Sequence, residues 1–544
     1  DATTQTGSAV NSSVFAGSTN AVILVVLDGT SAPATTGLTA SILVGVPSSF
    51  AQGVTIKGLN IRKFTGYGID LITGFNTVVG NFIGTNEVGT VAAGNGTGIN
   101  VTTNAQVGGN NRIGISGDIT STNIISGNTL DGVNISGQST LNSIKLNLIG
   151  TNKNGTAAIA NGENGVWILG ASKNNTVGGS VTGPAEGNLI SGNGTFDVQT
   201  GAGISGCGVL IAGSGADSNI VNGNLIGVTR TGLLALPNAE DGVQVAGGAI
   251  LNTIGGTTSN FRNLVSGNLG NGVQINSSSQ NKVQGNLIGT NLTTTATIPN
   301  RCNGISVTGS VNTIGGTALG ARNVIGGSVP DLTSNCVVST IGNGIEIRVG
   351  DTNSILNNSI GWDEISLVQL PNAGAGIKIF GSAAVGNLIG DGTSQGANSI
   401  YRNAGLGISL GNGTTPTPNG VNPSSGPNNF QNYPVITSVV NGATTTTISG
   451  TLTSAPSQSY RLQFFTSPTP NGSGFFQGAQ YEGSALVVTD VVGNVSFASV
   501  VGPPVLPIGS NVTITATNVL TGDTSEFSVA AATTPVELVR FTAD

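Results

Sequence analysis

Charged side chains are scarce in this chain of 544 residues. Asp, Glu, Lys and Arg make up 8 % of it, against about 25 % in an ordinary soluble protein. The 17 Lys and Arg residues are spread along the chain and the net charge is −7, so no basic stripe exists for phosphates and a nucleic-acid partner is excluded. Histidine is absent, which excludes a catalytic triad with a His base and zinc sites of the usual composition.

Long apolar runs and methionine are also missing. The run 22–27 is far shorter than the roughly 18 residues that span a bilayer, so membrane insertion is not expected. The chain begins at Asp1 without a start methionine. We therefore expect a signal peptide to have been removed and the protein to be extracellular or on the cell surface.

There are only three cysteines. Cys302 and Cys336 lie on neighbouring repeats of the pattern described below, so we predict a disulfide between them, the alternative being two small buried apolar residues. Cys207 lies three repeats before Cys302, roughly 14 Å away at the usual strand spacing, which is too far to bridge. We expect it to be a buried thiol, because no His is present to activate it.

Glycine, by contrast, is abundant, with 87 residues, and it recurs in register. A step of Gly, Val or Ile, any residue and an apolar residue returns every 30 to 43 residues. It begins at Gly68, Gly98, Gly132, Gly165, Gly208, Gly242, Gly272, Gly304, Gly344, Gly376 and Gly407. Eleven copies of one unit identify a repeat protein.

Each unit contains three short strand-like segments, and an asparagine precedes the second and the third. The unit from Gly272 shows all three segments, at 273–275, 282–283 and 287–288, with Asn281 and Asn286 before the last two. Such short strands bury a core only by stacking. We predict an all-β fold: a parallel β-helix of about 12 coils over residues 21–411, right-handed by the crossover rule, with ladders of asparagine amides and glycine at corners with positive φ.

Alternate units differ after the third segment. One kind continues into a long loop, as at 150–156, and the other returns quickly through a Ser-Gly-Asn sequence, as at 191–193. The pattern predicts a row of protruding loops along one edge, about 10 Å apart.

The pattern changes on both sides of the repeats. Residues 1–20 are small and polar, typical of a flexible arm or a donated strand. Residues 412–432 contain four prolines and indicate a linker or cap. Seven strand-like runs, the last at 527–530, predict an immunoglobulin-like antiparallel β-sandwich over 433–531. Residues 532–544 form a tail with a further strand-like pattern.

Three kinds of sequence block carry a family resemblance. The block Gly80–Asn86 and the repeated Asn-Leu-Ile-Ser-Gly-Asn sequences, together with Asp28–Pro33, resemble the right-handed parallel β-helix repeats of large exported bacterial surface proteins in the pectate-lyase-like superfamily. The resemblance covers roughly residues 20 to 430 and implies the fold. It does not select among the lyases, hydrolases, tailspikes, adhesins and structural rods that share these repeats.

Carboxylates offer little chemistry in this pattern. The best pair is Glu163 with Glu240, each two residues before a repeat glycine and two coils apart, hence about 10 Å. That is close to the roughly 6.5–9.5 Å of inverting glycosidases, and Trp167 lies close enough to stack on a sugar. Gly206 occupies the coil between them, and the alternative is two solvated loop residues.

Metal ligands are equally sparse, and we expect no organic cofactor. Structural Ca²⁺ has two candidate sites, at the adjacent acids Glu240 and Asp241 and at Asp363 and Glu364, where loop carbonyls could complete the ligand set.

Without stacked acids, the sequence favours a non-enzymatic extracellular structural protein, a fibre or filament subunit that assembles head to tail by strand addition at its ends. The residues proposed for this self-association are Thr3, Val10, Val14, Val536, Leu538 and Phe541. The alternatives are an adhesin or tailspike-like protein with glycans as partners, and a polysaccharide lyase or glycoside hydrolase.

Overall fold

The computed structural model describes residues 1–12, 19–32, 43–44, 53–103, 109–180, 187–194, 206–330, 341–471 and 474–534. Its chain divides into two compact units, one formed by residues 1–309 and 319–342 and the other by 310–318 and 343–544. Among the described residues the only helices are short 3-10 turns, and no helix has the length and hydropathy that a membrane span requires. The turns are η1 (Ala2–Thr4), η2 (Ile119–Ser121), η3 (Ser259–Phe261) and η4 (Pro427–Phe430).

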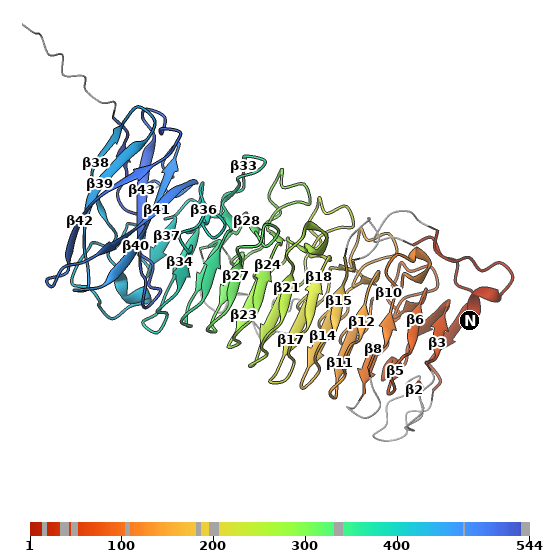
Figure 1. Ribbon diagram of the computed structural model, residues 1–544. Coiled ribbons are helices and arrows are strands. Elements are labelled where there is room, and N and C mark those ends of the chain that lie inside the picture. The colour runs from red at the N-terminus through yellow and green to blue at the C-terminus, as the bar shows by residue number, and fades with distance from the viewer. Residues whose placement is uncertain are drawn as a thin grey trace, which may run out of the picture. The chain divides into compact units, whose positions relative to one another are not determined.

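The first unit is a stack of coils in which the chain visits three parallel sheets in turn (Figure 1). Sheet 1 contains β1 (Val25–Asp28), β4 (Leu59–Arg62), β7 (Phe82–Ile83), β10 (Ile124–Ile125), β13 (Leu148–Ile149), β16 (Leu189–Ile190), β19 (Leu225–Ile226), β22 (Leu264–Val265), β25 (Leu287–Ile288) and β28 (Val324–Ile325). Sheet 2 contains β2 (Leu43–Val44), β5 (Tyr67–Leu71), β8 (Thr97–Thr102), β11 (Val133–Ser136), β14 (Val166–Leu169), β17 (Val209–Ala212), β20 (Val243–Ala246), β23 (Val273–Asn276) and β26 (Ile305–Val307). Sheet 3 contains β3 (Thr55–Lys57), β6 (Thr77–Val79), β9 (Arg112–Ile113), β12 (Ser143–Ile144), β15 (Thr176–Gly178), β18 (Ile220–Asn222), β21 (Thr253–Gly255) and β24 (Lys282–Gln284).

The second unit has the same coil pattern and then an antiparallel sandwich. Its coil strands are β31 (Ser359–Ile360) and β36 (Ser399–Ile400) in sheet 1, β29 (Ile345–Ile347), β34 (Ile377–Ile379) and β37 (Ile408–Leu410) in sheet 2, and β27 (Thr313–Gly315), β30 (Ser354–Leu356) and β35 (Leu388–Ile389) in sheet 3. The hairpin β32 (Trp362–Asp363) and β33 (Val368–Gln369) projects from one coil. The predicted parallel β-helix followed by antiparallel sheets is confirmed.

The sandwich packs a three-stranded sheet against a four-stranded one. The first contains β38 (Val435–Asn441), β39 (Thr446–Thr453) and β42 (Asn494–Val501), and the second contains β41 (Gln480–Val488), β40 (Ser459–Ser467), β43 (Asn511–Asn518) and β44 (Ala531–Ala532). Both sheets contribute to one core, for example through Ile448, Phe464 and Ile514. The expected strand at 527–530 is not formed; the immunoglobulin type itself stays a prediction.

Asparagine ladders hold the coils in register, as the sequence predicts. In one column Asn76 donates its side-chain amide to Asn111, and Asn111 donates to Asn142 at 3.0 Å. A second column runs through Asn81 and Asn123. The structure adds a third column that we did not predict: Asn95, Asn128, Asn161, Asn193, Asn238, Asn268 and Asn300. In all three columns the buried amides donate toward the carboxy-terminal end, which satisfies the donor and acceptor of every interior member.

The repeat glycines have a role other than the one expected. None of them is at positive φ, but a methyl group at Gly98 would lie 2.5 Å from the carbonyl oxygen of Gly132 and 2.8 Å from the Asn128 amide. Close stacking of the coils therefore demands glycine here. Positive φ occurs at other glycines, such as Gly84 (φ 89°), which supply the corners.

The long loops lie on alternate coils, but they do not protrude singly. Each folds over the outer side of sheet 1 and donates a backbone hydrogen bond to the loop before it: Lys153 to Gly89, Arg230 to Gly155 and Leu292 to Gly232, at 2.9–3.1 Å. The predicted row of separate loops is thus a second layer of the unit.

The amino-terminal residues pack on their own unit. The Asn11 side chain is buried and donates to the Ile119 carbonyl at 2.9 Å, and Thr19 donates to the Lys153 carbonyl at 2.8 Å. Ile23 is buried against Phe82, Ile124 and Leu148. The described part of the expected arm therefore covers the outer side of sheet 1.

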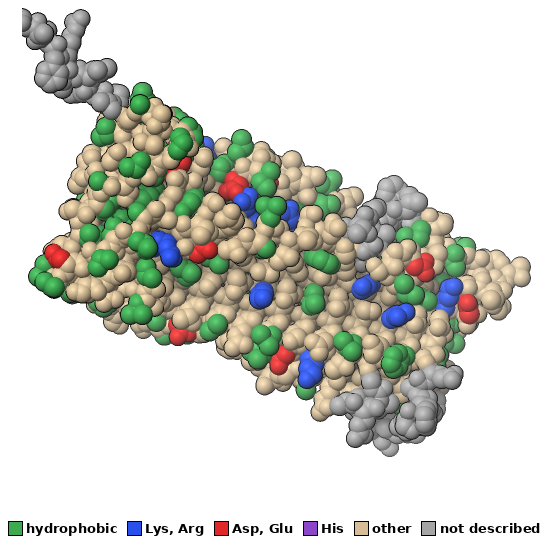
Figure 2. All heavy atoms as spheres, in the orientation of Figure 1, with side chains coloured by type: hydrophobic (Ala, Val, Ile, Leu, Met, Phe, Trp, Pro, Cys, Tyr) green, Lys and Arg blue, Asp and Glu red, His purple; other side chains and the backbone are tan. Residues whose placement is uncertain are grey.

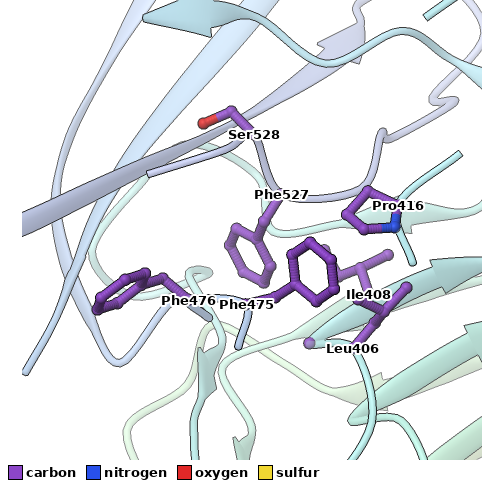
Figure 3. Close-up of a pocket in the computed structure, with 8 residues that line it drawn as sticks. Leu406, Ile408, Pro416, Phe475, Phe476, Phe527 and Ser528 are labelled. Atoms are coloured by element: carbon purple, nitrogen blue, oxygen red, sulfur yellow. The ribbon is translucent and has the colours of Figure 1, made fainter. Parts of the chain in front are cut away.

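The predicted linker at 412–432 and the sandwich close the last coil of the second unit. Phe527 stacks edge-on against Phe465 and lies with Phe475 over Leu406 and Ile408 (Figure 3). The space left between these side chains is ≈ 10 Å³, about one water molecule. The crevice is thus packed core and not a ligand pocket.

Candidate functional site

The outer face of sheet 2 carries the most varied side chains of the repeat. Cross-strand pairing aligns its outward column as the sequence predicts, through Asn100, Asn134, Trp167, Leu210, Gln244 and Gln274. These side chains are half-buried or buried. These six residues are uncharged, and Asp70 of β5 begins the column, where it accepts from the Asn100 side-chain amide at 2.8 Å.

Glu163 and Glu240 lie at equivalent places on the corner that precedes the strands of sheet 2. The Glu163 amide donates to the Leu130 carbonyl and the Glu240 amide donates to the Gly206 carbonyl, both at 3.1 Å. Gly206 therefore occupies the intervening coil, as predicted, and the two glutamates are two strand spacings apart, about 10 Å. Since glycine has no side chain, the space above Gly206 is left to its neighbours.

Ala239 fills that space, since a methyl group at Gly206 would lie 2.8 Å from the Ala239 Cβ. Glu240 follows Ala239, and its side chain approaches Cys207. Its Oε2 lies 3.7 Å from the Cys207 Sγ, which donates to it from the coil before. Burial is the main cause that raises the Glu240 pKa to about 7, and the charge of Asp241 adds to it. Burial also raises the pKa of the Cys207 thiol, and the negative charges of Asp241 and Glu240 raise it further. With a pKa of about 7, Glu240 is present in both protonation states near neutral pH, and Cys207 is an inert thiol donor.

The two buried aspartates on this corner have a structural role. Asp131 accepts from the backbone and side-chain amides of Asn164, and Asp241 accepts from those of Asn271. At these positions each asparagine donates toward the amino-terminal end. Each aspartate, on the coil before it, therefore needs only to accept. Burial raises the pKa of each aspartate to about 6. The signal in the sequence is the residue before each repeat glycine, which is an aspartate or an asparagine in these four units.

Two polar atoms on the same face have no hydrogen-bond partner. They are the Asn134 Oδ1 and the Trp167 Nε1, both buried, and the two residues are cross-strand neighbours. Because both atoms are buried, a hydroxyl-bearing ligand reaches them only after one of the two side chains changes rotamer.

Positive charge is absent from this part of the chain. No Lys or Arg occurs between Lys173 and Arg230, and the face shown in Figure 2 has few charged side chains among uncharged polar ones. The stretch between those two residues, which includes the coil of Gly206, therefore contributes no cation to this corner.

The calcium candidates do not gather into a metal site. Asp241 accepts hydrogen bonds from the side-chain amides of Asn271 and Gln244. Asp363, which precedes Glu364 in the hairpin turn, accepts from the Ile365 amide and the Ser366 hydroxyl. Across the described ranges no group of three or more His, Cys, Asp or Glu residues could hold a metal ion.

The remaining predicted site residues are spread over the two units. Cys302 is disulfide-bonded and Cys207 is free; Cys336, the predicted partner, lies outside the described residues. Of the assembly candidates, Thr3 belongs to η1 and Val10 is 40 % exposed. Val14, Val536, Leu538 and Phe541 lie outside the described residues, so the pairing and the assembly roles stay predictions.

Comparison with solved structures gives a similarity of fold. No family model and no curated protein matches the chain. Among solved structures, the chain is similar to the A-module of the mannuronan C-5 epimerase AlgE4 of Azotobacter vinelandii, at 14 % identity and a TM-score of 0.30, over 59 % of this chain and 84 % of that one. At this level the similarity concerns the fold alone.

The match corrects one prediction. We predicted that the chain is not an enzyme, and this prediction is contradicted because the matched β-helix belongs to a polysaccharide epimerase. Its grounds were the lack of stacked acids, the low charge and the uncharged polar surface, and none of these excludes catalysis.

Proposed function

We propose that the chain is an exported protein that binds a polysaccharide along the outer face of sheet 2 and hydrolyses it, with Glu240 as proton donor. The observation that carries the proposal is the environment of Glu240: a half-buried carboxyl, held by a thiol, with its pKa raised to about 7. General acids of glycosidases are carboxyls whose pKa is raised in this way.

Glu163 is the proposed general base. It stands at the equivalent place two coils away, on the far side of Gly206. The backbone spacing of about 10 Å is near the carboxyl separation of about 6.5–9.5 Å that admits a water molecule in inverting glycosidases. In the proposed reaction Glu240 protonates the leaving oxygen, while Glu163 takes a proton from the attacking water, so we expect inversion at the anomeric carbon.

Trp167 is the proposed sugar platform. It lies on the coil of Glu163, and it is the cross-strand neighbour of Asn134. Sugar rings stack on tryptophan, and their hydroxyls both donate and accept.

The test measures reducing ends released from a panel of neutral and acidic polysaccharides. We expect Glu240→Gln to lower turnover at least 100-fold while binding persists, and Trp167→Ala to weaken binding. Glu482→Gln is the matched control, because Glu482 is another carboxyl with a raised pKa, in β41 of the sandwich. No turnover and no binding on any substrate, or equal turnover by Glu240→Gln, contradicts the proposal.

A second candidate function is a structural rod at the cell surface. Its support is the continuity of the amide ladders within each unit, for example from Asn81 through Asn123 and Asn147 to Asn188, which makes a stack of coils stiff along its axis. Surface fractionation with negative-stain microscopy tests it: a chain confined to the cytoplasm removes this candidate and the proposed export together.

A further inference from the structure

The first coil presents unpaired strand amides. In sheet 3 the first residue of each strand donates its amide to the coil before: Thr77 to Val54, Arg112 to Asn76 and Ser143 to Asn111, at 2.8–2.9 Å. Thr55 is aligned with these residues, so its N–H points to the amino-terminal edge. Within the part of the chain that the structure describes, no acceptor lies there.

This edge is also apolar. Val54 is 45 % exposed, Leu24 is 48 % exposed and Thr55 is exposed. The 3-10 turn η1 covers only the corner after β3, where a methyl group at Gly58 would lie 2.7 Å from the Thr3 Cγ2. An exposed strand edge of this kind is a template for another strand.

The end of the sandwich is followed by a strand-like sequence. Thr534 pairs in parallel with Val440, donating to the Val439 carbonyl at 2.9 Å and accepting from the Asn441 amide at 3.1 Å. The strand β38 ends at Asn441, so Thr534 pairs at the end of that strand. The sequence that follows, Val-Glu-Leu-Val-Arg-Phe at 536–541, is a strand pattern rich in β-branched and aromatic residues.

We propose that residues 536–541 of one copy add as a strand to the amino-terminal edge of a second copy, at β3. The donor and the acceptor are different surfaces of the chain, so the contact is heterologous and repeats from copy to copy into an open fibre. Backbone amides such as that of Thr55 provide the hydrogen bonds, and the exposed Val54 and Leu24 provide the apolar contact.

The experiment measures the mass of the full chain and of a chain that ends at Thr534, by light scattering after gel filtration. We expect multimers from the full chain and monomers from the shortened one. A synthetic peptide of residues 535–544 should bind the shortened chain one to one, and a scrambled peptide should not bind.

The acceptor is tested with Thr55→Pro, which removes the edge N–H and is tolerated at a sheet edge. We expect the peptide to bind this variant at least tenfold more weakly, with an unchanged melting temperature. If the variant does not fold, Leu538→Asp in the peptide gives the same readout. The proposal is overturned by multimers that persist after the truncation, by equal peptide binding to Thr55→Pro, or by a full chain that stays monomeric and a peptide that does not bind.

Discussion

The first coil of the first unit and the last coil of the second unit are closed in different ways. At the last coil, Asn387 donates its backbone amide to the Asn428 Oδ1, and Asn403 donates its side-chain amide to the Gln477 Oε1. At the first coils, Val54 and Leu59 occupy the ladder positions and donate only their backbone amides, to Asn76 and Asn81. One end is thus capped by polar side chains, and the other begins with apolar ones.

The polarity of the ladders explains the difference. Their amides donate toward the carboxy-terminal end, so an orphaned donor arises only at the last coil, where burial without an acceptor is costly. For these ladders, the first coil requires no side-chain acceptor. A cap that provides side-chain acceptors is therefore needed at one end, and the other end is left available for a strand.

Removing the cap should have the largest effect. A chain that ends at Gly411 exposes Ile389, Ile400 and Leu410, which are at most 4 % exposed in the full chain, together with unpaired strand edges. We expect loss of soluble monomer in gel filtration. A soluble monomer with an unchanged melting temperature contradicts the account of the cap.

A matched pair of substitutions sharpens the comparison. Leu410 is 3 % exposed and Leu24 is 48 % exposed. We expect Leu410→Ser to lower the free energy of unfolding by about 3–5 kcal/mol, as for other large-to-small core changes, and Leu24→Ser by less than about 0.5 kcal/mol. Urea unfolding measures both, and equal effects would show that the two ends are equally buried.

The ladder termini should also differ. Asn428→Ala leaves the Asn387 amide without its acceptor and removes the bond to the Asn387 carbonyl, so we expect a loss of about 2 kcal/mol. The change at the other end, Val54→Ala, should cost less than about 0.5 kcal/mol. Thermal unfolding of both variants checks this, and a larger loss for Val54→Ala would refute the polarity argument.

The two ends should respond to pH with opposite sign. Glu526 of the cap accepts from the Leu410 and Thr417 amides, and burial raises its pKa to about 7. Its stabilising protonated form is fully present below the usual pKa and is lost as pH rises through 7. Because the two amides favour the ionised form, we expect a loss of about 1 kcal/mol.

At the amino-terminal end, the Thr30 hydroxyl and amide, with Arg62, hold the pKa of Asp28 well below its usual range. The stability that it contributes is present above the usual pKa and is lost as pH falls. Unfolding curves from pH 3 to 8 for Glu526→Gln and Asp28→Asn separate the two effects. If the Glu526→Gln variant still loses stability as pH rises, the loss does not come from Glu526.

The sequence predicted the repeat well and the ends poorly. The Gly and Asn columns placed Trp167 beside Asn134 and Glu163 two coils from Glu240, because equivalent residues in a stacked repeat must align. The seventh sandwich strand, expected at 527–530, was wrong because Phe527 packs instead over Gly407 in the last coil. A run of alternating apolar residues has the same sequence pattern whether it pairs as a strand or packs against the last coil.

The environment of Glu240 was also beyond the sequence. Its neighbour Cys207 lies 33 residues away in the sequence and meets it only through the stacking of the coils. The buried Asp131 and Asp241 look like solvated acids until the Asn164 and Asn271 amides are placed on them.

What the amino-acid sequence alone determined is the coil: its length, its three strands and the residues that stack, since a one-dimensional repeat brings each residue to the same place one turn later. Only the tertiary structure decided how the coils are closed at their ends and which carboxyl groups are buried away from water. Those features rest on single residues, such as Asn428, Gln477 and Cys207, that meet their partners through packing rather than through repetition.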